Sequence, residues 1–231
     1  MNSDATALIV FAREPKNGKV KTRLLAGLPS TSVTGLYQSF IKDILRIARH
    51  VDCSAKYVFY VGRGKKDIPF LAKQAKGFIL RRQSRGDLGK RMLGAFQHCY
   101  AQGYGRMVVV GTDCLTMTSE DLNKAFQKLK RFDVVLGPSK DGGYYLLGLR
   151  YPDPRLFQGI SWSTGQVLSK TKDRLRSCRY SFSGLPVKED IDTMDSLKRF
   201  MRNPQKSRLA PDTACYLKQI KALLFNRNCV K

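Results

Sequence analysis

The amino-acid sequence predicts an α/β fold, in which helices cover both faces of a mainly parallel sheet. Short apolar runs predict strands at residues 7–13, 56–62, 78–83, 106–112, 133–138 and 144–150. Segments with helical periodicity alternate with them, at residues 33–50, 68–75, 88–102, 120–131, 165–177, 194–202 and 213–224. Because short connections between alternating strands and helices favour parallel pairing, we expect the ligand site beyond the carboxyl ends of the strands.

Capping residues and one polar segment give the expected boundaries. Side chains that can cap a helix precede three of the helical patterns: Ser119, Ser163 or Thr164, and Thr193. The segment 203–212, "NPQKSRLAPD", is expected to be a polar connector to a final helix. We therefore expect one large domain over residues 1–203 and a basic helical tail over residues 204–231 that packs on this domain or follows it.

The composition is that of a globular protein with an unusual charge. The chain has 231 residues, a hydrophobic fraction of 42% and a net charge of +24. This charge would attract nucleic acid, acidic membrane surfaces or phosphorylated ligands, but it is spread along the chain as on a solvated surface. The apolar run at residues 5–12 is too short to span a membrane, and the separated cysteines fit free thiols in the cytoplasm. The number of subunits stays open.

The first predicted strand runs into a loop that is dense in cations. Residues 8–25, "LIVFAREPKNGKVKTRLL", contain five of them: Arg13, Lys16, Lys19, Lys21 and Arg23. The loop lacks the G-x-x-x-x-G-K-[ST] spacing, which excludes a P-loop NTPase. Two interpretations remain. Either Gly18 lets the backbone approach a pyrophosphate that Lys21 and Arg23 neutralise, or the loop is a solvated basic surface.

Three further segments offer carboxylates to the same edge of the sheet. Asp113 follows a run of valines, where it could bind a metal, act in catalysis or simply start a turn. Asp141 lies between two predicted strands in "SKDGG", so it could stand at a reacting centre or belong to a hairpin turn. An acidic cluster could cap the next helix or supply a second metal ligand: Glu189, Asp190, Asp192 and Asp195.

The sequence gives little support to hydrolase or zinc chemistry. It has no G-x-S-x-G motif, and its two histidines, His50 and His98, fall in helical patterns. The six cysteines form no C-x-x-C pair. A nucleophilic hydrolase and a structural zinc site are therefore not expected.

Six blocks within residues 8–200 follow one another in a recognisable order. They read "FAREPKNGKVKTRL", "QSRGDLGKRM", "GTDCLTM", "GPSKDGGYYLLGL", "ISWSTGQVL" and "DIDTMDSL". This order resembles the DUF2064 family, a group of glycosyltransferase-like, selenodomain-associated transferases in the nucleotide-diphospho-sugar transferase (GT-A) superfamily. The resemblance implies a Rossmann-like GT-A fold over residues 1–203. Leu115 and Met194 replace the usual prolines, and Asp195-Ser196 replaces a common Glu-Asp.

The resemblance also implies roles for these blocks. Asp113 and Asp192 would hold Mg²⁺ or Mn²⁺, and the first loop would hold the phosphates of a nucleotide. The implied nucleotide-binding residues are Ala12, Arg13, Gly18, Lys21, Arg23, Gln83, Asp87 and Gly111. The implied catalytic residues are Lys21, Asp113 and Asp141, of which Asp141 is either a general base on an acceptor hydroxyl or a hydrogen-bonding partner of the sugar. The acceptor side would include Gly142, Gly143 and Trp162, although Trp162 could equally be a core residue.

Three functional hypotheses follow. The leading one is a metal-dependent transferase that moves a sugar from a nucleotide-activated donor to a small acceptor. The alternative is a nucleotidyltransferase that joins an NTP to a phosphorylated small molecule and releases pyrophosphate. The third is a polyanion-binding protein without catalysis, which the net charge of +24 suggests. The chain lacks an RNA-binding strand with interleaved basic and aromatic residues, which argues against the third.

Overall fold

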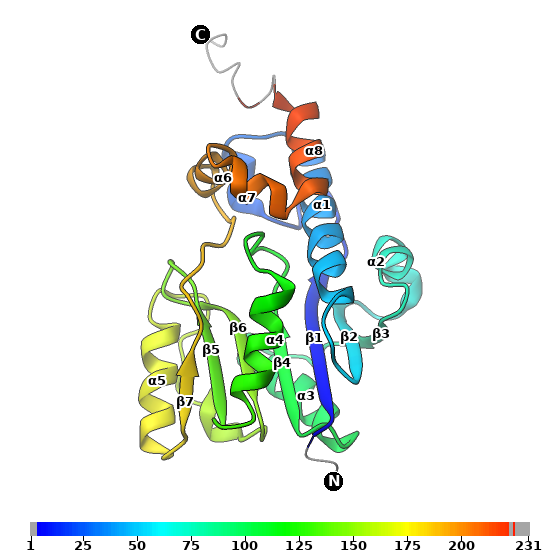
Figure 1. The fold of residues 1–231 in the computed structure, drawn as a ribbon. Helices are drawn as coiled ribbons and strands as arrows, with labels where there is room; N and C mark the ends of the chain where they lie inside the picture. The colour runs from blue at the N-terminus through cyan, green and yellow to red at the C-terminus, as the bar shows by residue number, and fades with distance from the viewer. Residues whose placement is uncertain (1–3, 222–223, 225–231) are drawn as a thin grey trace.

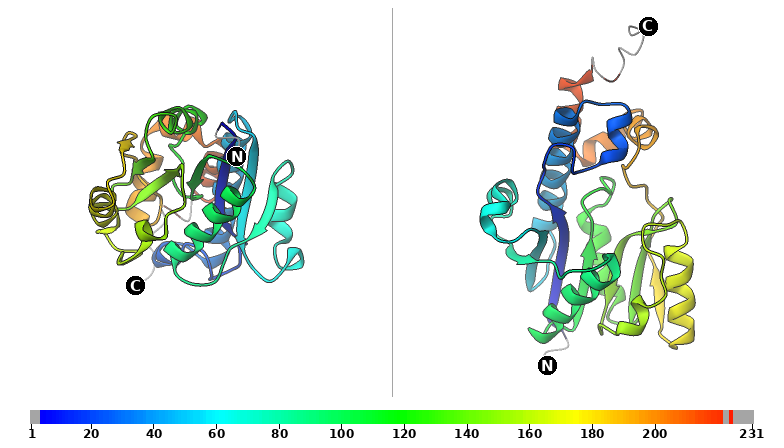
Figure 2. Two further views of the ribbon diagram at one scale, coloured as in Figure 1. Left: turned by 90° about the horizontal axis from the view of Figure 1, so that it is seen from below. Right: turned by 180° about the vertical axis from the view of Figure 1, so that it is seen from behind.

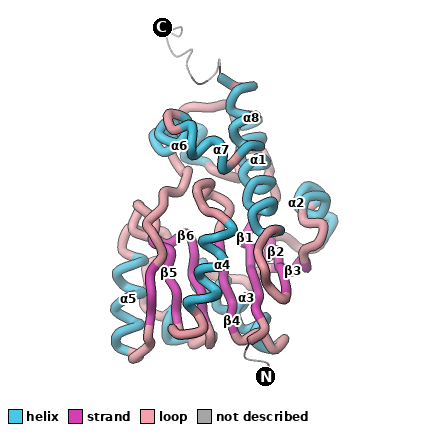
Figure 3. Tube along the Cα trace, viewed as in Figure 1, coloured by secondary structure: helices cyan, strands magenta, loops and turns pink. Residues whose placement is uncertain are grey.

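A seven-stranded sheet forms the centre of the molecule (Figures 1 and 3). The computed structural model describes residues 4–221 and 224. Its strands are β1 (Thr6–Arg13), β2 (Ala55–Val61), β3 (Ile79–Arg82), β4 (Arg106–Val110), β5 (Val134–Pro138), β6 (Tyr144–Leu149) and β7 (Phe182–Gly184). They lie in the order β3-β2-β1-β4-β6-β5-β7. The predicted α/β class is confirmed.

Parallel pairing dominates the sheet. β1 pairs in parallel with β2 and β4, β2 with β3, and β5 with β7, whereas β6 runs antiparallel to β4 and β5. The exception has a local cause, since the connection from β5 to β6 is too short for a helical crossover. All six predicted strands are present, with ends that differ by at most two residues. Only β7, a strand of 3 residues, was missed because it has no apolar run.

Helices cover both faces, as predicted. The helices are α1 (Ser30–Arg49), α2 (Pro69–Gln74), α3 (Leu88–Ala101), α4 (Ser119–Lys128), α5 (Val167–Ser177), α6 (Met194–Met201), α7 (Pro204–Leu209) and α8 (Pro211–Gln219). Three short 3-10 turns accompany them: η1 (Thr22–Ala26), η2 (Lys65–Asp67) and η3 (Pro154–Phe157). One core cluster joins the sheet to α1, α2 and α4, and the second joins it to α3, η3 and α5 (Figure 2).

Two of the predicted helix starts need correction. Thr193 caps α6 as predicted. Thr118 rather than Ser119 caps α4, because its hydroxyl accepts a hydrogen bond within the first turn. The prediction of Ser163 or Thr164 as the cap of α5 was wrong, because that helix begins later and has no side-chain cap.

The C-terminal segment also differs from the prediction. The stretch predicted as a polar connector forms α7, and its Pro204 takes the first helical position, which proline favours. The predicted final helix begins at Pro211 as α8, and part of its predicted last turn lies outside the described residues. The division into residues 1–203 and 204–231 stays a prediction. None of the helices in the described part of the chain is long and apolar enough to cross a membrane.

Candidate active site

The loop after β1 places Lys21 at the carboxyl edge of the sheet. The chain turns at Gly18, with φ +69°, and then buries Val20 and Leu24 in the core. Lys21 lies between these two anchors in the left-handed region, with φ 45° and ψ 45°. A non-glycine residue is strained there, so the fold holds this side chain in position at some cost.

The ammonium group of Lys21 lies between two carboxylates. Its Nζ is 2.8 Å from Oδ2 of Asp113 and 3.4 Å from Oδ1 of Asp192. Nη1 of Arg23 approaches the other oxygen of Asp192 at 2.7 Å. The side chain of Lys21 is only 7% exposed, whereas that of Arg23 is 68% exposed. The buried pair therefore involves Lys21, and Arg23 remains at the solvent-facing rim.

Opposite charges keep Lys21 protonated. Burial alone would lower the pKa of its ammonium group, but the adjacent Asp113 carboxylate, with a smaller contribution from Asp192, raises the pKa above its ordinary value. The structure therefore brings together four of the predicted site residues: Lys21, Arg23, Asp113 and Asp192.

An extended segment, residues 185–192, carries Asp192 to the site; we call it the strap. Backbone hydrogen bonds from Leu185 and Lys188 join the strap to β5, and Ile191 N donates to the carbonyl of Asp113 at 3.0 Å. Ile191 is buried in the core. Because residues two apart in an extended chain share a side, Asp190 and Asp192 both face the site.

Asp190 belongs to the acidic cluster of the sequence, but the family resemblance implied no role for it. Its Oδ1 is buried and has no hydrogen-bond partner. Burial raises the pKa of its carboxyl group to about 8, and the nearby Asp113 and Asp141 add to this rise. The sequence signal that could have identified it is the D-x-D pattern, in which Asp190 and Asp192 flank the apolar Ile191.

The β5–β6 hairpin presents Asp141. Its Oδ1 accepts hydrogen bonds from the Ser139 hydroxyl and, at 3.0 Å, from the backbone N–H of Gly143. Gly142 has φ +85°, and a Cβ at this position would lie 2.0 Å from the carbonyl oxygen of Gly165. Glycine is therefore required where the hairpin touches the loop before α5. The segment is a hairpin turn, and it also orients a carboxylate.

Trp162 lies on that same loop and is half buried. Its ring stacks on Phe157 with centroids 6.3 Å apart. It also lies against Gly89 at the start of α3, where an added Cβ would come within 2.4 Å of the ring. The ring is thus held between α3 and η3 while its exposed part lines the cleft described next.

These elements enclose an open cleft of about 750 Å³. Most of the predicted site residues line it: Ala12, Arg13, Lys21, Arg23, Gln83, Gly111, Asp113, Asp141, Gly143, Trp162 and Asp192. Three predicted residues are not part of its lining. Gly18 forms the turn in the loop, Gly142 packs on Gly165, and Asp87 caps α3 by accepting from Lys90 N at 2.8 Å.

Two further lining residues were not among the predicted site residues. The hydroxyl of Tyr37, on α1, accepts hydrogen bonds from Arg13 N and from Thr112 Oγ1, both at 3.2 Å. It thereby ties the end of β1 to the end of β4. Arg91, on α3, donates through Nε to the carbonyl of Gly86. A buried tyrosine in an apolar helix pattern looks like a core residue in any sequence.

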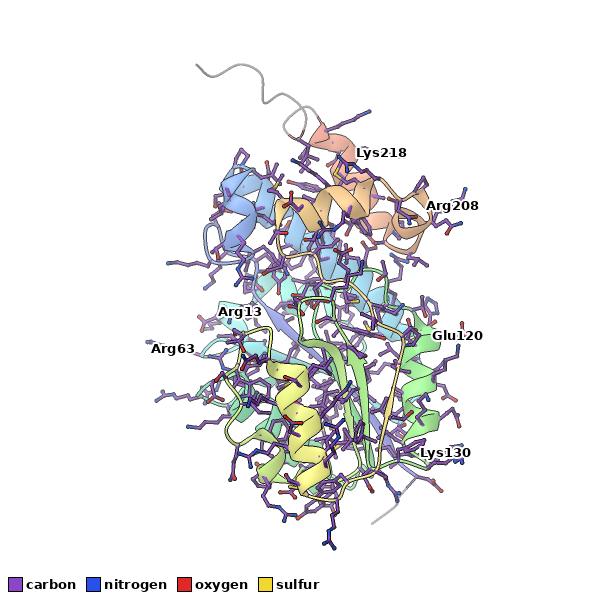
Figure 4. All side chains as sticks on the ribbon, turned by 90° about the vertical axis from the view of Figure 1, so that its left-hand side faces the viewer. Arg13, Arg63, Glu120, Lys130, Arg208 and Lys218 are labelled. Carbon is purple, nitrogen blue, oxygen red and sulfur yellow. The ribbon has the colours of Figure 1, made fainter. Side chains whose placement is uncertain are left out.

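The basic residues extend far beyond the cleft. Exposed cations outside its lining include Arg63, Lys130, Arg208 and Lys218 (Figure 4). Lys130 lies near the end of the molecule opposite α7 and α8, which carry Arg208 and Lys218. The charge that is local to the cleft is therefore only a small part of the total of +24.

Comparisons with known proteins identify a family and several relatives. A family model described as "Uncharacterized protein conserved in bacteria (DUF2064)" matches residues 44–164. A solved structure from Desulfovibrio desulfuricans G20, provisionally assigned as a nucleotide-diphospho-sugar transferase, is 31% identical, with 97% of each chain covered and a TM-score of 0.87. The 2-phospho-L-lactate guanylyltransferase of Methanocaldococcus jannaschii is 22% identical over 198 residues, which are 85% of this chain and 83% of that protein.

A more distant structure shares the fold and was solved with manganese. It is Rv0371C from Mycobacterium tuberculosis H37Rv, 15% identical, with a TM-score of 0.51 and coverage of 86% of this chain and 98% of that one. The D. desulfuricans structure and the M. jannaschii protein both have transferase names, which confirms the prediction of an enzyme of the transferase class. The family model covers more than half of the chain, and the D. desulfuricans structure matches nearly all of it; the chain belongs to the DUF2064 family.

Proposed function

We propose that the protein is a metal-dependent enzyme that moves a sugar from a nucleotide-activated donor to the hydroxyl group of a small acceptor. The observation that carries this proposal is the division of charge within the cleft. The β1 loop contributes a cationic side with Arg13, Lys19, Lys21 and Arg23. The hairpin side has the Asp141 carboxylate and the Trp162 ring, and none of the described lining residues of the hairpin and the 162–165 loop is a cation.

The cationic side suits a diphosphate. Phosphate oxygens form strong, charge-assisted hydrogen bonds with lysine and arginine, and Lys21 and Arg23 come from a loop whose backbone is anchored in the core. Ala12, Gln83 and Gly111 also line the cleft, and we assign the base and ribose to them.

The carboxylates suit a hard divalent cation. Asp113 and Asp192 offer only oxygen ligands, which Mg²⁺ and Mn²⁺ prefer, and the orphan Oδ1 of Asp190 lies beside them. Among the residues that the structure describes, no group of three or more His, Cys, Asp or Glu is assembled around a metal position. Phosphates and water would therefore complete the coordination. The relative with manganese supports the choice of metal. When bound, the cation would offset charge on the leaving diphosphate.

The hairpin side suits an uncharged acceptor. A hydroxyl group needs a base to become a good nucleophile, and Asp141 is held in the cleft by two hydrogen bonds to one of its oxygens. A phosphorylated acceptor would be repelled by the same carboxylate and would meet no cation on the hairpin and the 162–165 loop. The β5–β6 glycines and Trp162 would then shape the space for the acceptor.

Nucleotidyl transfer is the second candidate. The curated relative from M. jannaschii, a guanylyltransferase, covers most of the chain and motivates it. The β1 loop and the pair of aspartates would serve a triphosphate as well as a diphosphate. In this case the hairpin side would have to accept a phosphorylated molecule, which its charge disfavours.

Calorimetric titration with a panel of NTPs and nucleotide-sugars distinguishes the two. Each ligand is titrated with Mg²⁺ or Mn²⁺ and again with EDTA, with Asp113→Ala as the matched control. Metal-dependent binding of one nucleotide-sugar, lost in Asp113→Ala, and release of a nucleoside diphosphate during turnover are expected. Preference for a bare NTP together with release of pyrophosphate would replace sugar transfer with nucleotidyl transfer. Binding of no nucleotide at all would contradict both.

A further inference from the structure

Lys21 occupies the position between the two carboxylates assigned to the metal. Its ammonium nitrogen contacts Oδ2 of Asp113 and Oδ1 of Asp192 at 2.8 and 3.4 Å, and its side chain is almost fully buried. A divalent cation that bridged the same two oxygens would lie within a few ångströms of this ammonium group. Two cations at such a separation repel each other strongly in a partly buried site.

We infer that Lys21 closes the carboxylate pair in the free protein, and that a divalent cation enters only when the phosphates of a nucleotide draw Lys21 away. This inference rests on the metal site of the proposed function. It adds an order of binding, in which the metal arrives with the nucleotide rather than before it, and a second role for Lys21.

The loop allows this exchange without a backbone movement. Val20 and Leu24 are buried on either side of Lys21 and hold the backbone in place. The side chain of Lys21 has a flexible four-carbon stem, and its ammonium group can exchange a carboxylate for a phosphate oxygen as its partner. When Lys21 pairs with a bound phosphate, the two aspartates lose their counter-ion and can bind a divalent cation in its place.

The lining of the site explains why the exchange is needed. Only two carboxylates flank Lys21 directly, and the residues that the structure describes form no larger cluster of metal-ligating side chains. Two carboxylates already neutralised by a lysine bind a divalent cation weakly. The same two carboxylates, with phosphate oxygens added and Lys21 withdrawn, match the ligand set that Mg²⁺ prefers.

Binding of Mn²⁺ alone, measured by electron paramagnetic resonance, tests the inference without turnover. Lys21→Met removes the ammonium group and keeps a side chain of similar length. We expect Lys21→Met to bind Mn²⁺ at least tenfold more tightly than the wild type when no nucleotide is present. Lys21→Gln is the second variant if Lys21→Met does not fold, and the same gain is expected. Equal or weaker Mn²⁺ binding by the folded variant would overturn the inference.

Lys16→Met is the matched control. Lys16 is exposed in the same loop, it does not line the cleft, and no described carboxylate forms an ion pair with it. Its removal changes the net charge equally, so a tenfold gain in Lys16→Met as well would assign the effect to overall charge and overturn the inference.

Mn²⁺ binding to the wild-type protein in the presence of a nucleoside diphosphate distinguishes failure of this inference from failure of the proposed function. Wild-type affinity for Mn²⁺ should rise when the nucleotide is added, and this gain should be smaller in Lys21→Met. Tight Mn²⁺ binding by the wild type without nucleotide, lost in Asp113→Asn, would overturn the inference and leave the metal site intact. Absence of Mn²⁺ binding in every protein, with and without nucleotide, would overturn the metal site itself.

Discussion

The carboxylate of Asp43, on α1, caps the first turn of α8, which lies 170 residues further along the chain. It is fully buried and accepts hydrogen bonds from the backbone N–H of Thr213 at 2.8 Å and from the Thr213 hydroxyl at 2.6 Å. It also accepts from Asp212 N at 3.0 Å and pairs with Arg46. Because α1 begins directly after the β1 loop and η1, this single side chain links the C-terminal helices to the element that supports the site.

Removal of this cap should destabilise the fold. Asp43→Ala is expected to lower the free energy of unfolding by about 2–4 kcal/mol, because it leaves buried donors of Thr213 without an acceptor. Urea denaturation followed by circular dichroism measures the change. Asp43→Asn keeps one acceptor oxygen and should lose less than Asp43→Ala. If Asp43→Ala loses no more than about 0.5 kcal/mol, as for an ordinary surface substitution, the cap is not needed to hold α8.

Gly89 and Trp162 provide a prediction with a direct optical readout. Gly89→Ala adds a Cβ that would lie 2.4 Å from the Trp162 ring, so the ring must move. Such overpacking is expected to cost about 1–3 kcal/mol. Trp162 is the only tryptophan, and its displacement towards water should shift the intrinsic fluorescence to longer wavelength. Lys90→Ala, at the neighbouring exposed position, should leave the spectrum unchanged. An unchanged spectrum in Gly89→Ala would contradict the observed packing.

Strong local patterns explain why most of the fold could be predicted. β1 and β4 are continuous apolar runs, which indicate strands buried on both faces, and α1 has a long apolar stripe. The errors occur where the pattern is short or polar. β7 has only 3 residues, and α7 has a polar sequence whose helix depends on the elements around it. Tertiary contacts rather than local propensity determine such elements.

The candidate site was predicted less completely than the fold. Asp113 could be selected because it follows a predicted strand, and Lys21 because it lies in the cation-rich loop after the first strand. The family resemblance singled out Asp192 from the acidic cluster. A role for Asp190 could be predicted only by knowing that Ile191 is buried in the core. A role for Tyr37 could be predicted only by knowing that the ends of β1 and β4 both lie within reach of its hydroxyl. The position of such a residue in the site depends on contacts between segments that are distant in sequence, and the hydrophobic periodicity of the sequence does not predict those contacts.

Asp153 gives a prediction about the pH dependence of stability. The side chain of Arg155 lowers the pKa of the buried Asp153 carboxyl group below its ordinary value, helped by the Arg155 backbone N–H and the Tyr180 hydroxyl. A carboxylate with a lowered pKa stabilises the fold above its unfolded pKa of about 3.9, and this contribution is lost as the pH falls through the folded pKa.

The test compares Asp153→Asn with the wild type by urea denaturation at pH 7 and at pH 3 or below. At pH 7 the variant should be about 1–2 kcal/mol less stable, and the difference should shrink as the pH falls. Asp173→Asn is the control, because Asp173 is an exposed residue on α5 that pairs with Arg176, so its effect should be small at every pH. A difference for Asp153→Asn that stays constant with pH would show that its ionised form is not the source of the stabilisation.

Asp141 provides a prediction about catalysis. If Asp141 takes a proton from the acceptor hydroxyl, Asp141→Asn should lower kcat by about 10²–10⁴-fold. Nucleotide affinity should change little, because Lys21, Arg23 and the metal would hold the phosphates on the other side of the cleft. Steady-state kinetics measures kcat, and calorimetric titration measures the nucleotide affinity.

Two variants of the same hairpin complete this test. Ser139→Ala removes the hydroxyl that donates to Asp141 and should lower kcat by a smaller factor, since the Gly143 N–H still orients the carboxylate. Lys140 is the control, because its exposed side chain does not line the cleft and its Nζ lies 3.9 Å from Oε2 of Glu189. Lys140→Ala should therefore leave kcat unchanged. If Asp141→Asn weakens acceptor binding and leaves kcat unchanged, Asp141 is a hydrogen-bonding partner of a substrate and not the base.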